Sequence, residues 1–399
     1  MARAEDINKD GPKAHANGVA HTAAQVLVIG AGAAGLSAAG ALKKIGLHST
    51  VLEQDPAIGG TWARRYDRLH LHTIRQLSGL PYMPISRRYP RYLARDQYVR
   101  YMQHYAKRLG LRVVTGCTVT SVKPGSGTAN PTWLVETDHG TWQSDVVVLA
   151  TGQYRVPRVP DWPGRETFGG QLVHSSDYRN GRSWVGKRAL VVGVGNSGAE
   201  IATDLADAGA SFVGMSIRTP PFLTRRDTLG MPVQLMSFAL GYLPRGVADK
   251  LARAVMRLAF GDMSGYGINA PGYSPYSDQR VPVIDVGFAK AVKQGRVTIF
   301  PDLAGLTPTG VRFKDGREEP FDLVVAATGF SSGLEGLLPL PGLLTDEGYP
   351  LYPSGEPTSL PGLYFAGFTH SLRGHLFEAN RTSRRLAAHI ASYLKSVTD

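Results

Sequence analysis

The stretch VLVIGAGAAGLSAAGAL, residues 26–42, combines a run of apolar residues, a glycine-rich turn and a run of small residues. A second stretch, ALVVGVGNSGAEIATDL at residues 189–205, repeats this pattern further along the chain. A buried strand followed by such a turn and a helix predicts a βαβ unit at each place. The sequence therefore predicts an α/β fold built around two similar units.

The glycines of the first turn have distinct roles. In Gly30-Ala-Gly32-Ala-Ala-Gly35 the first takes a tight turn with positive φ, the second lets a pyrophosphate approach the backbone, and the third lets helix pack on strand. The next strand ends at Glu53, where a carboxylate accepts the hydroxyls of an unphosphorylated ribose. This favours FAD or NAD over NADP.

The second turn, Gly193-Val-Gly195-Asn-Ser-Gly198, precedes a strand that ends in Arg218 instead of an acid. A guanidinium at that position suits a 2′-phosphate, so we expect NADPH there, with Ser216, Thr219 and Arg226 as assistants. The chain is thus expected to hold two Rossmann-like dinucleotide-binding domains, one for FAD and one for NADPH. Hydride would pass from the nicotinamide to the flavin.

The order of the motifs predicts a domain inserted into another. We expect the FAD-binding domain over residues 24–160 and 320–399, and the NADPH-binding domain over 161–319, with a helical and loop-rich insertion at about 219–285. Residues 1–23 are polar and are expected to be a disordered tail. The apolar runs are strand-length and no signal peptide is visible, so no membrane span and a cytoplasmic location are expected.

Cysteine and charge narrow the classes further. The single cysteine, Cys117, excludes an intrachain disulfide and a flavoenzyme that reduces a disulfide through its own pair of thiols. It also leaves no basis for a metal site built on Cys/His pairs. The net charge of +12 comes from dispersed basic residues, which favours anionic cofactors and substrates over nucleic acid.

Further motifs resemble those of the class B flavin-dependent monooxygenases. Besides the two glycine turns, the family-like elements are Gly59-Gly60-Thr61-Trp62, the signature Phe168-x-Gly170-x-x-x-His174-x-x-x-Tyr178 just before the second nucleotide strand, and the strand-end motifs Ala150-Thr151-Gly152 and Ala327-Thr328-Gly329-Phe330. Within that class, LHLHTIRQLSGLPYMP (69–84), FGDMSGYGINAP (260–271), RVPVIDVGFAKAVKQGRV (280–297) and GLYFAGFTHSLRGH (362–375) resemble the YUCCA enzymes. The first of these stretches lacks the Asn that the N- and S-oxidising branch often carries beneath the flavin.

The resemblance implies an NADPH- and O2-dependent FAD monooxygenase that works through a flavin C4a-(hydro)peroxide. YUCCA enzymes convert indole-3-pyruvate to indole-3-acetate in auxin biosynthesis, so oxidative decarboxylation of an aryl 2-keto acid is the expected reaction. The alternatives are an N- or S-oxygenating or Baeyer–Villiger monooxygenase, and an NADPH oxidase or flavin reductase. The expected partners are a small-molecule substrate and O2, with a homodimer as one candidate assembly.

The candidate site residues follow from these motifs and their neighbours. Asn196 is a candidate for contact with NADP or the flavin edge, against the alternative of a simple turn residue. His174 is expected to brace a domain linker. The histidines His70, His72, His370 and His375 are candidates for positions near the flavin and are expected to be structural instead of catalytic, and Arg373 is a candidate for binding a substrate carboxylate. No metal site is expected. The cofactor contacts expected are Gly30, Gly32, Gly35, Glu53, Gln54, Gly60, Thr61, Trp62, Thr151, Gly152, Gly193, Gly195, Asn196, Ser197, Gly198, Arg218, Thr328, Gly329 and Gly367.

Overall fold

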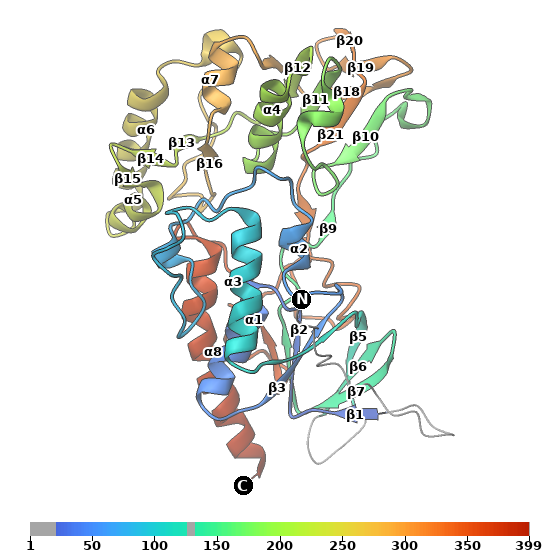
Figure 1. Cartoon of the computed structure of the whole chain (residues 1–399), viewed down its shortest axis with the longest axis vertical. Coiled ribbons are helices and arrows are strands. Elements are labelled where there is room, and N and C mark those ends of the chain that lie inside the picture. The colour runs from blue at the N-terminus through green and yellow to red at the C-terminus, as the bar shows by residue number, and fades with distance from the viewer. Residues whose placement is uncertain (1–20, 126–131, 399) are drawn as a thin grey trace, which may run out of the picture.

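Two five-stranded parallel sheets form the centre of the molecule, toward opposite ends of its long axis (Figure 1). The computed structural model describes residues 21–125 and 132–398. The first sheet has the order β23 (Leu363–Phe365), β8 (Val146–Leu149), β2 (Val26–Ile29), β3 (Ser49–Glu53) and β4 (Arg112–Thr115). The second has the order β10 (Gln171–His174), β21 (Leu323–Ala326), β11 (Arg188–Val192), β12 (Phe212–Ser216) and β17 (Thr298–Phe300). The expected α/β fold is confirmed.

The first sheet is covered on both faces. Successive residues of a strand point to opposite sides, so Val26 and Val28 of β2 pack with helices α1 (Ala33–Lys44), α3 (Arg95–Arg108) and α8 (His375–Thr398). Leu27 and Ile29 pack on the other face, against a four-stranded sheet. That sheet has the order β1 (His21–Ala23), β7 (Gly140–Ser144), β6 (Trp133–Thr137) and β5 (Val119–Pro124). Burial of both faces explains why β2 reads as a continuous apolar run.

The second sheet repeats this layering. Ala189 and Val191 of β11 pack with α4 (Asn196–Ala208) and α7 (Phe288–Lys293). Leu190 and Val192 face a three-stranded antiparallel sheet of β18 (Leu303–Thr307), β19 (Gly310–Phe313) and β20 (Glu318–Pro320). Each half therefore has helices on one face of its parallel sheet and an antiparallel sheet on the other.

A further segment covers the edge of the second half that lies at the upper left of Figure 1. This segment is the one expected to be an insertion at about residues 219–285. It holds α5 (Val233–Leu240), α6 (Arg245–Phe260) and short strands, of which β13 (Leu223–Arg225) pairs in parallel with β16 (Val283–Asp285). The strands β14 (Asp227–Thr228) and β15 (Met231–Pro232) form a small hairpin before α5.

The chain crosses between the halves twice, and the two crossings are hydrogen-bonded to each other. The outgoing connection contains β9 (Val156–Pro157) and the returning one contains β22 (Phe330–Ser331). These strands pair antiparallel, with Phe330 opposite Pro157 and Ser331 opposite Val156. The two crossings therefore form one ribbon between the sheets.

The structure differs from the sequence expectations at several places. Residues 21–23, expected in the disordered tail, form β1 and pair in parallel with β7; residues 1–20 lie outside the described part of the chain. Strand β21 follows the expected boundary at residue 320 yet pairs with β10 and β11, so it belongs to the second sheet. Strand β4 pairs in parallel with β3 at the edge of the first sheet. Strand partners are set by contacts distant in sequence, which a local pattern does not report.

No helix among residues 21–125 and 132–398 is both long enough and apolar enough to cross a bilayer.

The packing of helix α1 on its strand yields a stability test. A Cβ added at Gly35 would overlap the carbonyl oxygen of Gly30, which is backbone and cannot move aside cheaply. We expect Gly35→Ala to lower the free energy of unfolding by about 1–3 kcal/mol, as overpacking does. Urea denaturation followed by circular dichroism measures it.

Gly246→Ala in α6 is the matched control, because its added Cβ meets no atom within 4 Å. That variant should be as stable as the parent or more stable by up to about 1 kcal/mol. Equal stability of both variants would contradict the close packing at Gly35.

Candidate functional site

The two glycine turns have nearly the same geometry. Gly30 follows β2 with φ of +106°, and Gly193 follows β11 with φ of +102°. A Cβ at Gly30 would lie 2.6 Å from the carbonyl oxygen of Ala150, and one at Gly193 would lie 2.6 Å from that of Ala327. Each turn is therefore pressed against the end of a neighbouring strand, where only glycine fits.

The middle glycine of each turn faces open space. A Cβ built on Gly32 or on Gly195 meets no atom within 4 Å. These two residues cap α1 and α4, helices of 12 and 13 residues whose first N–H groups have no partner within the helix. Unpaired N–H groups and the positive end of the helix dipole together attract anions. Both turns thus have the open cradle and the donors that the pyrophosphate of a dinucleotide needs.

Glu53 ties the first turn to the strand beside it. Its Oε2 accepts a hydrogen bond from the Ala31 N–H at 2.6 Å, and its Oε1 accepts one from the Asp55 N–H at 2.9 Å. Burial raises the pKa of this carboxyl above its usual value, although the two N–H groups oppose the shift. Each oxygen retains a second lone pair, so the carboxylate has acceptors left for ribose hydroxyls.

Arg218 stands at the corresponding end of β12, beyond Ser216 and Ile217. Its side chain is exposed and has no hydrogen-bond or ion-pair partner in the described part of the chain. The expected assistants differ from one another. Ser216 is buried and donates its hydroxyl to the Pro301 carbonyl at 2.8 Å, so its expected role is wrong. Thr219 is exposed.

Arg226 is occupied elsewhere. Its guanidinium lies 4.3 Å from the centre of the Tyr92 ring, and its Nε is buried without a hydrogen-bond partner. Of the three expected assistants, only Thr219 is therefore left exposed and unengaged beside Arg218.

The stretch that follows β3 forms the short helix α2 (Gly60–Ala63). A Cβ on Gly60 would overlap the carboxylate of Asp55, so this glycine is required by close packing. Trp62 is partly buried and packs against Tyr98 of α3, with ring centres 5.1 Å apart. Gln54 and Thr61 are exposed. The tryptophan thus braces this loop against a core helix.

The two Ala-Thr-Gly motifs end β8 and β21 and begin the crossings. The hydroxyl of Thr151 is buried and has no hydrogen-bond partner, which is the state expected of a group that awaits a ligand. The Thr328 hydroxyl donates to the Arg158 carbonyl and is therefore occupied within the ribbon. Gly152 and Gly329 have φ of +85° and +88° and no atom within 4 Å of an added Cβ. Gly367 has φ of +86°, and an added Cβ there would lie 2.5 Å from Ala34.

His174 braces the second crossing, which agrees with its expected role. Its Nε2 donates to the Gly329 carbonyl at 3.0 Å, while its Nδ1 accepts from the Ser176 N–H at 3.1 Å. Desolvation lowers the pKa of this imidazole. A neutral ring with one donating and one accepting nitrogen satisfies both contacts.

Asn196 begins helix α4 and binds a distant strand. Its Oδ1 accepts a hydrogen bond from the Ile284 N–H of β16 at 2.7 Å. Its neighbour Ser197 is hydrogen-bonded to the Tyr66 hydroxyl. Asn196 therefore connects the second turn to the 219–285 segment, which is a positioning contact. Its expected cofactor contact stays a prediction.

The other histidines and Arg373 have structural partners. His70 is bonded to the Arg68 carbonyl at 2.8 Å, and the His370 ring lies edge-on to that of Tyr349. His375 donates from Nδ1 to the Thr369 carbonyl at 3.0 Å, and burial lowers its pKa. Arg373 lies 5.4 Å from the Phe238 ring. Each of these four side chains therefore has a structural contact.

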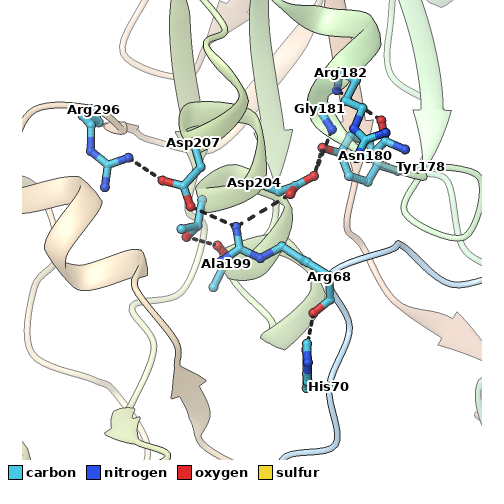
Figure 2. A network of polar contacts seen from close by, with 11 residues as sticks. Arg68, His70, Tyr178, Asn180, Gly181, Arg182, Ala199, Asp204, Asp207 and Arg296 are labelled. Carbon is cyan, nitrogen blue, oxygen red and sulfur yellow. Dashed lines mark hydrogen bonds and ion pairs between the residues drawn. The ribbon is translucent and has the colours of Figure 1, made fainter. Parts of the chain in front are cut away.

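Contacts between the halves, shown in Figure 2, were missed by the sequence reasoning. Arg68 extends from the loop after α2 to α4, with Nη1 3.2 Å from an Asp207 oxygen and 3.8 Å from an Asp204 oxygen. Asp204 also accepts from the Tyr178 hydroxyl at 2.7 Å. Arg296 pairs with Asp207 at 2.6 Å. No local pattern indicated these contacts, because the acidic partners of Arg68 lie far away in the sequence.

A buried carboxylate lies on the same helix, one turn nearer its start. Glu200 is 3% exposed, its Oε1 lies 2.9 Å from His72 Nε2, and it is hydrogen-bonded to the Tyr66 hydroxyl. Tyr66 belongs to the core of the second half although it follows a strand of the first. The loop after α2 is therefore part of both halves, and His72 lies beside the Glu200 carboxylate there.

Comparison with known proteins agrees with this arrangement. The family model for flavin-binding monooxygenase-like proteins matches residues 23–337. The chain is 36% identical over 352 residues to indole-3-pyruvate monooxygenase YUCCA1 of Oryza sativa subsp. japonica, with 86% of each chain covered. It is 31% identical over 362 residues to the probable indole-3-pyruvate monooxygenase YUCCA4 of Arabidopsis thaliana, covering 88% of this chain and 87% of that one.

Among solved structures, a mutant flavin monooxygenase from Stenotrophomonas maltophilia superposes with a TM-score of 0.71 at 25% identity. The match covers 93% of this chain and 99% of that one. The family match and the paired cradles together show that this chain is a flavoprotein oxidoreductase that belongs to the flavin-binding monooxygenase-like family.

Proposed function

We propose that this protein is an NADPH- and O2-dependent FAD monooxygenase that decarboxylates an aryl 2-oxo acid oxidatively, with indole-3-pyruvate as the first candidate. The balanced reaction is RCOCOOH + O2 + NADPH + H⁺ → RCOOH + CO2 + NADP⁺ + H2O. The observation that carries the cofactor assignment is the contrast between the two cradles. One is closed by the buried carboxylate of Glu53, and the other by the free guanidinium of Arg218.

The residues of the first cradle fit FAD. The N–H groups at the start of α1 would hold its pyrophosphate beside Gly32, and Glu53 would accept its ribose hydroxyls. The unpaired hydroxyl of Thr151 would take a polar atom of the same molecule. Bound FAD would supply the oxygen-activating chemistry, while these side chains orient it.

The residues of the second cradle fit NADPH. The N–H groups at the start of α4 would hold the pyrophosphate beside Gly195, and Arg218 would bind the 2′-phosphate. Asn196 and His174 hold the segments on either side, through Ile284 and Gly329. The chain would thus fix the position from which hydride is delivered.

The substrate assignment rests on the relatives. The names of two relatives, at 36% and 31% identity, give indole-3-pyruvate monooxygenase, and both matches span most of this chain. The loop at residues 69–84 contains no Asn, which favours this branch over N- or S-oxygenation. Baeyer–Villiger and oxidase activities are the alternatives, and product analysis separates them.

Product formation tests the reaction directly. We expect the FAD-loaded protein to form one indole-3-acetate and one CO2 for each NADPH consumed with indole-3-pyruvate, measured by liquid chromatography and NADPH absorbance. Consumption of NADPH with an equal amount of H2O2 and no acid would instead identify an oxidase. Sulfoxides from thioanisole or esters from cyclic ketones, without decarboxylation, would identify the other branches.

Glu53→Gln tests the first cradle. An amide cannot accept hydrogen bonds from Ala31 and Asp55 with both of its terminal atoms, so we expect FAD to bind about tenfold more weakly or worse. FAD affinity is measured by fluorescence titration of the apoprotein. An unchanged affinity would contradict the role of Glu53, and Glu166→Gln, at an exposed glutamate, is the control.

The raised pKa of Glu53 predicts how FAD affinity depends on pH. The ionised form accepts the ribose hydroxyls, so FAD affinity of the parent should fall as pH drops through this raised pKa, above the ordinary value of 4.5. Glu53→Gln has no proton to gain there and should lack this decrease. The same fall in both proteins would assign it to another group.

Arg218→Ala tests the second cradle. A guanidinium–phosphate contact contributes about 1.5–3 kcal/mol, so the NADPH:NADH preference in flavin reduction should fall by roughly 10-fold or more. Stopped-flow absorbance of the flavin measures both rates across cofactor concentrations. Arg165→Ala removes an exposed arginine outside the cradle and should keep the parent preference. An unaltered ratio in Arg218→Ala would remove this residue from the phosphate site.

A further inference from the structure

Arg65 lies where both crossings leave their sheets. Its guanidinium lies 4.4 Å from the centre of the Phe330 ring, and its Nη2 is 3.4 Å from the Tyr154 carbonyl oxygen. Phe330 immediately follows the second Ala-Thr-Gly motif, and Tyr154 follows the first by two residues. The side chain therefore sits at the junction of the two halves, beside the ends of both central sheets.

This cation is partly buried and has no acidic partner. None of the ion pairs in the described part of the chain includes Arg65. Burial lowers the pKa of its guanidinium, and the positive charge of Arg64 lowers it further. A guanidinium has five N–H donors, and among residues 21–125 and 132–398 that of Arg65 makes one hydrogen bond, to the Tyr154 carbonyl. Placing an unpaired cation away from water is unfavourable unless an anion joins it.

The neighbouring arginines show that this lack is specific. Arg64 pairs with Asp55, Arg68 pairs with Asp207, and Arg95 pairs with both Asp67 and Asp96. The acids of this loop are thus occupied by other arginines. Arg65 alone among the arginines of residues 64–68 has no carboxylate, in a chain part that the structure describes fully.

The backbone at this position is held in place. The Arg65 carbonyl accepts hydrogen bonds from Arg95 Nη1 and, at 3.4 Å, from Arg179 Nη1. The ring of Phe330 supports the guanidinium from one side and is in turn held edge-on by His174. A cation fixed in this way loses little freedom on binding an anion, which favours recognition.

We propose that Arg65 binds the carboxylate of an acidic aryl substrate at the junction of the two halves. The inference rests on the proposed function and extends it to the residue that selects an acid. A planar guanidinium binds a carboxylate through two parallel hydrogen bonds. The ring of Tyr154 is exposed and lies edge-on to that of Phe330, so these two rings offer a surface against which an aryl group packs.

A phosphate group of the dinucleotide offers the same anion chemistry. The carboxylate is favoured because the second cradle already has its own anion donors, namely the N–H groups of α4 and Arg218. The experiment therefore measures both kinds of anion separately.

The test compares Arg65→Gln and Arg65→Lys with the parent in oxidised, FAD-loaded protein. The probes are phenylpyruvate, phenylacetate, NADP⁺ and phenylacetone, the last being phenylpyruvate with a methyl group in place of the carboxylate. Dissociation constants come from the change in flavin absorbance, without turnover. Arg182→Gln removes an exposed arginine whose side chain has no partner in the part of the chain that the structure describes, and it matches the loss of one charge.

We expect Arg65→Gln to raise the dissociation constants of phenylpyruvate and phenylacetate about tenfold or more. Phenylacetone and NADP⁺ should stay within about twofold of the parent, as should every probe in Arg182→Gln. Arg65→Lys keeps the charge but not the paired donors, so it should recover part of the loss. Retained FAD and an unchanged circular dichroism spectrum establish that the variants fold.

Other results overturn the inference. A weaker NADP⁺ complex with unchanged phenylpyruvate binding would assign Arg65 to the dinucleotide. Unchanged binding of both anions, or a parent protein that binds neither carboxylate, would leave no anion site at Arg65.

The proposed function stands or fails separately. If the parent binds phenylacetate through Arg65 but does not decarboxylate 2-oxo acids, the carboxylate site is upheld and the reaction assignment is wrong. If the parent decarboxylates them and Arg65→Gln keeps the same KM, the reaction is upheld and the role of Arg65 is wrong.

Discussion

This structure depends on the close approach of each glycine turn to the end of the strand that lies beside it in the sheet. At both turns the first glycine lies against a backbone carbonyl of the neighbouring strand, and the third lies against the first. Any side chain at either position would push the helix away from its sheet. The helix N-terminus would then move from the strand ends, and the donors that form the cradle would disperse. Packing and binding thus depend on the same absent side chains.

Two cradles with the same backbone differ through their charged neighbours. Glu53 is buried and held by two N–H groups, whereas Arg218 is exposed and unpaired. These surroundings suit the proposed roles. The fixed carboxylate of Glu53 can accept hydrogen bonds from ribose hydroxyls, and the exposed guanidinium of Arg218 can move to bind a phosphate. The loop after α2 connects the two sites. It carries Arg68 and His72 to helix α4 and places the unpaired Arg65 between the crossings.

The sequence predicted the features that are encoded in short stretches of residues. The two βαβ units and the glycine turns could be inferred because each is encoded within a few dozen residues. The bracing role of His174 was inferred from its resemblance to a family motif, since its partner Gly329 lies far away in the sequence. The membership of β21 in the second sheet could not be inferred, since its apolar run would suit either one. The sequence also could not predict that the Ser216 hydroxyl donates its hydrogen bond to the Pro301 carbonyl. Nor could it predict that Arg65 has no carboxylate beside it while Arg64 pairs with Asp55. These depend on which distant segments meet, and a single sequence does not report that.

The paired crossings β9 and β22 have a mechanical consequence. A single strand between the two halves would let them rotate about its axis, because rotation about backbone φ and ψ angles costs little energy. Two antiparallel strands joined by hydrogen bonds resist that rotation about the strand axis. Bending of the ribbon is then the easier motion, so the ribbon acts as a hinge. Any rearrangement of the halves during a reaction cycle should therefore follow an arc about this ribbon, with Arg65 close to its axis.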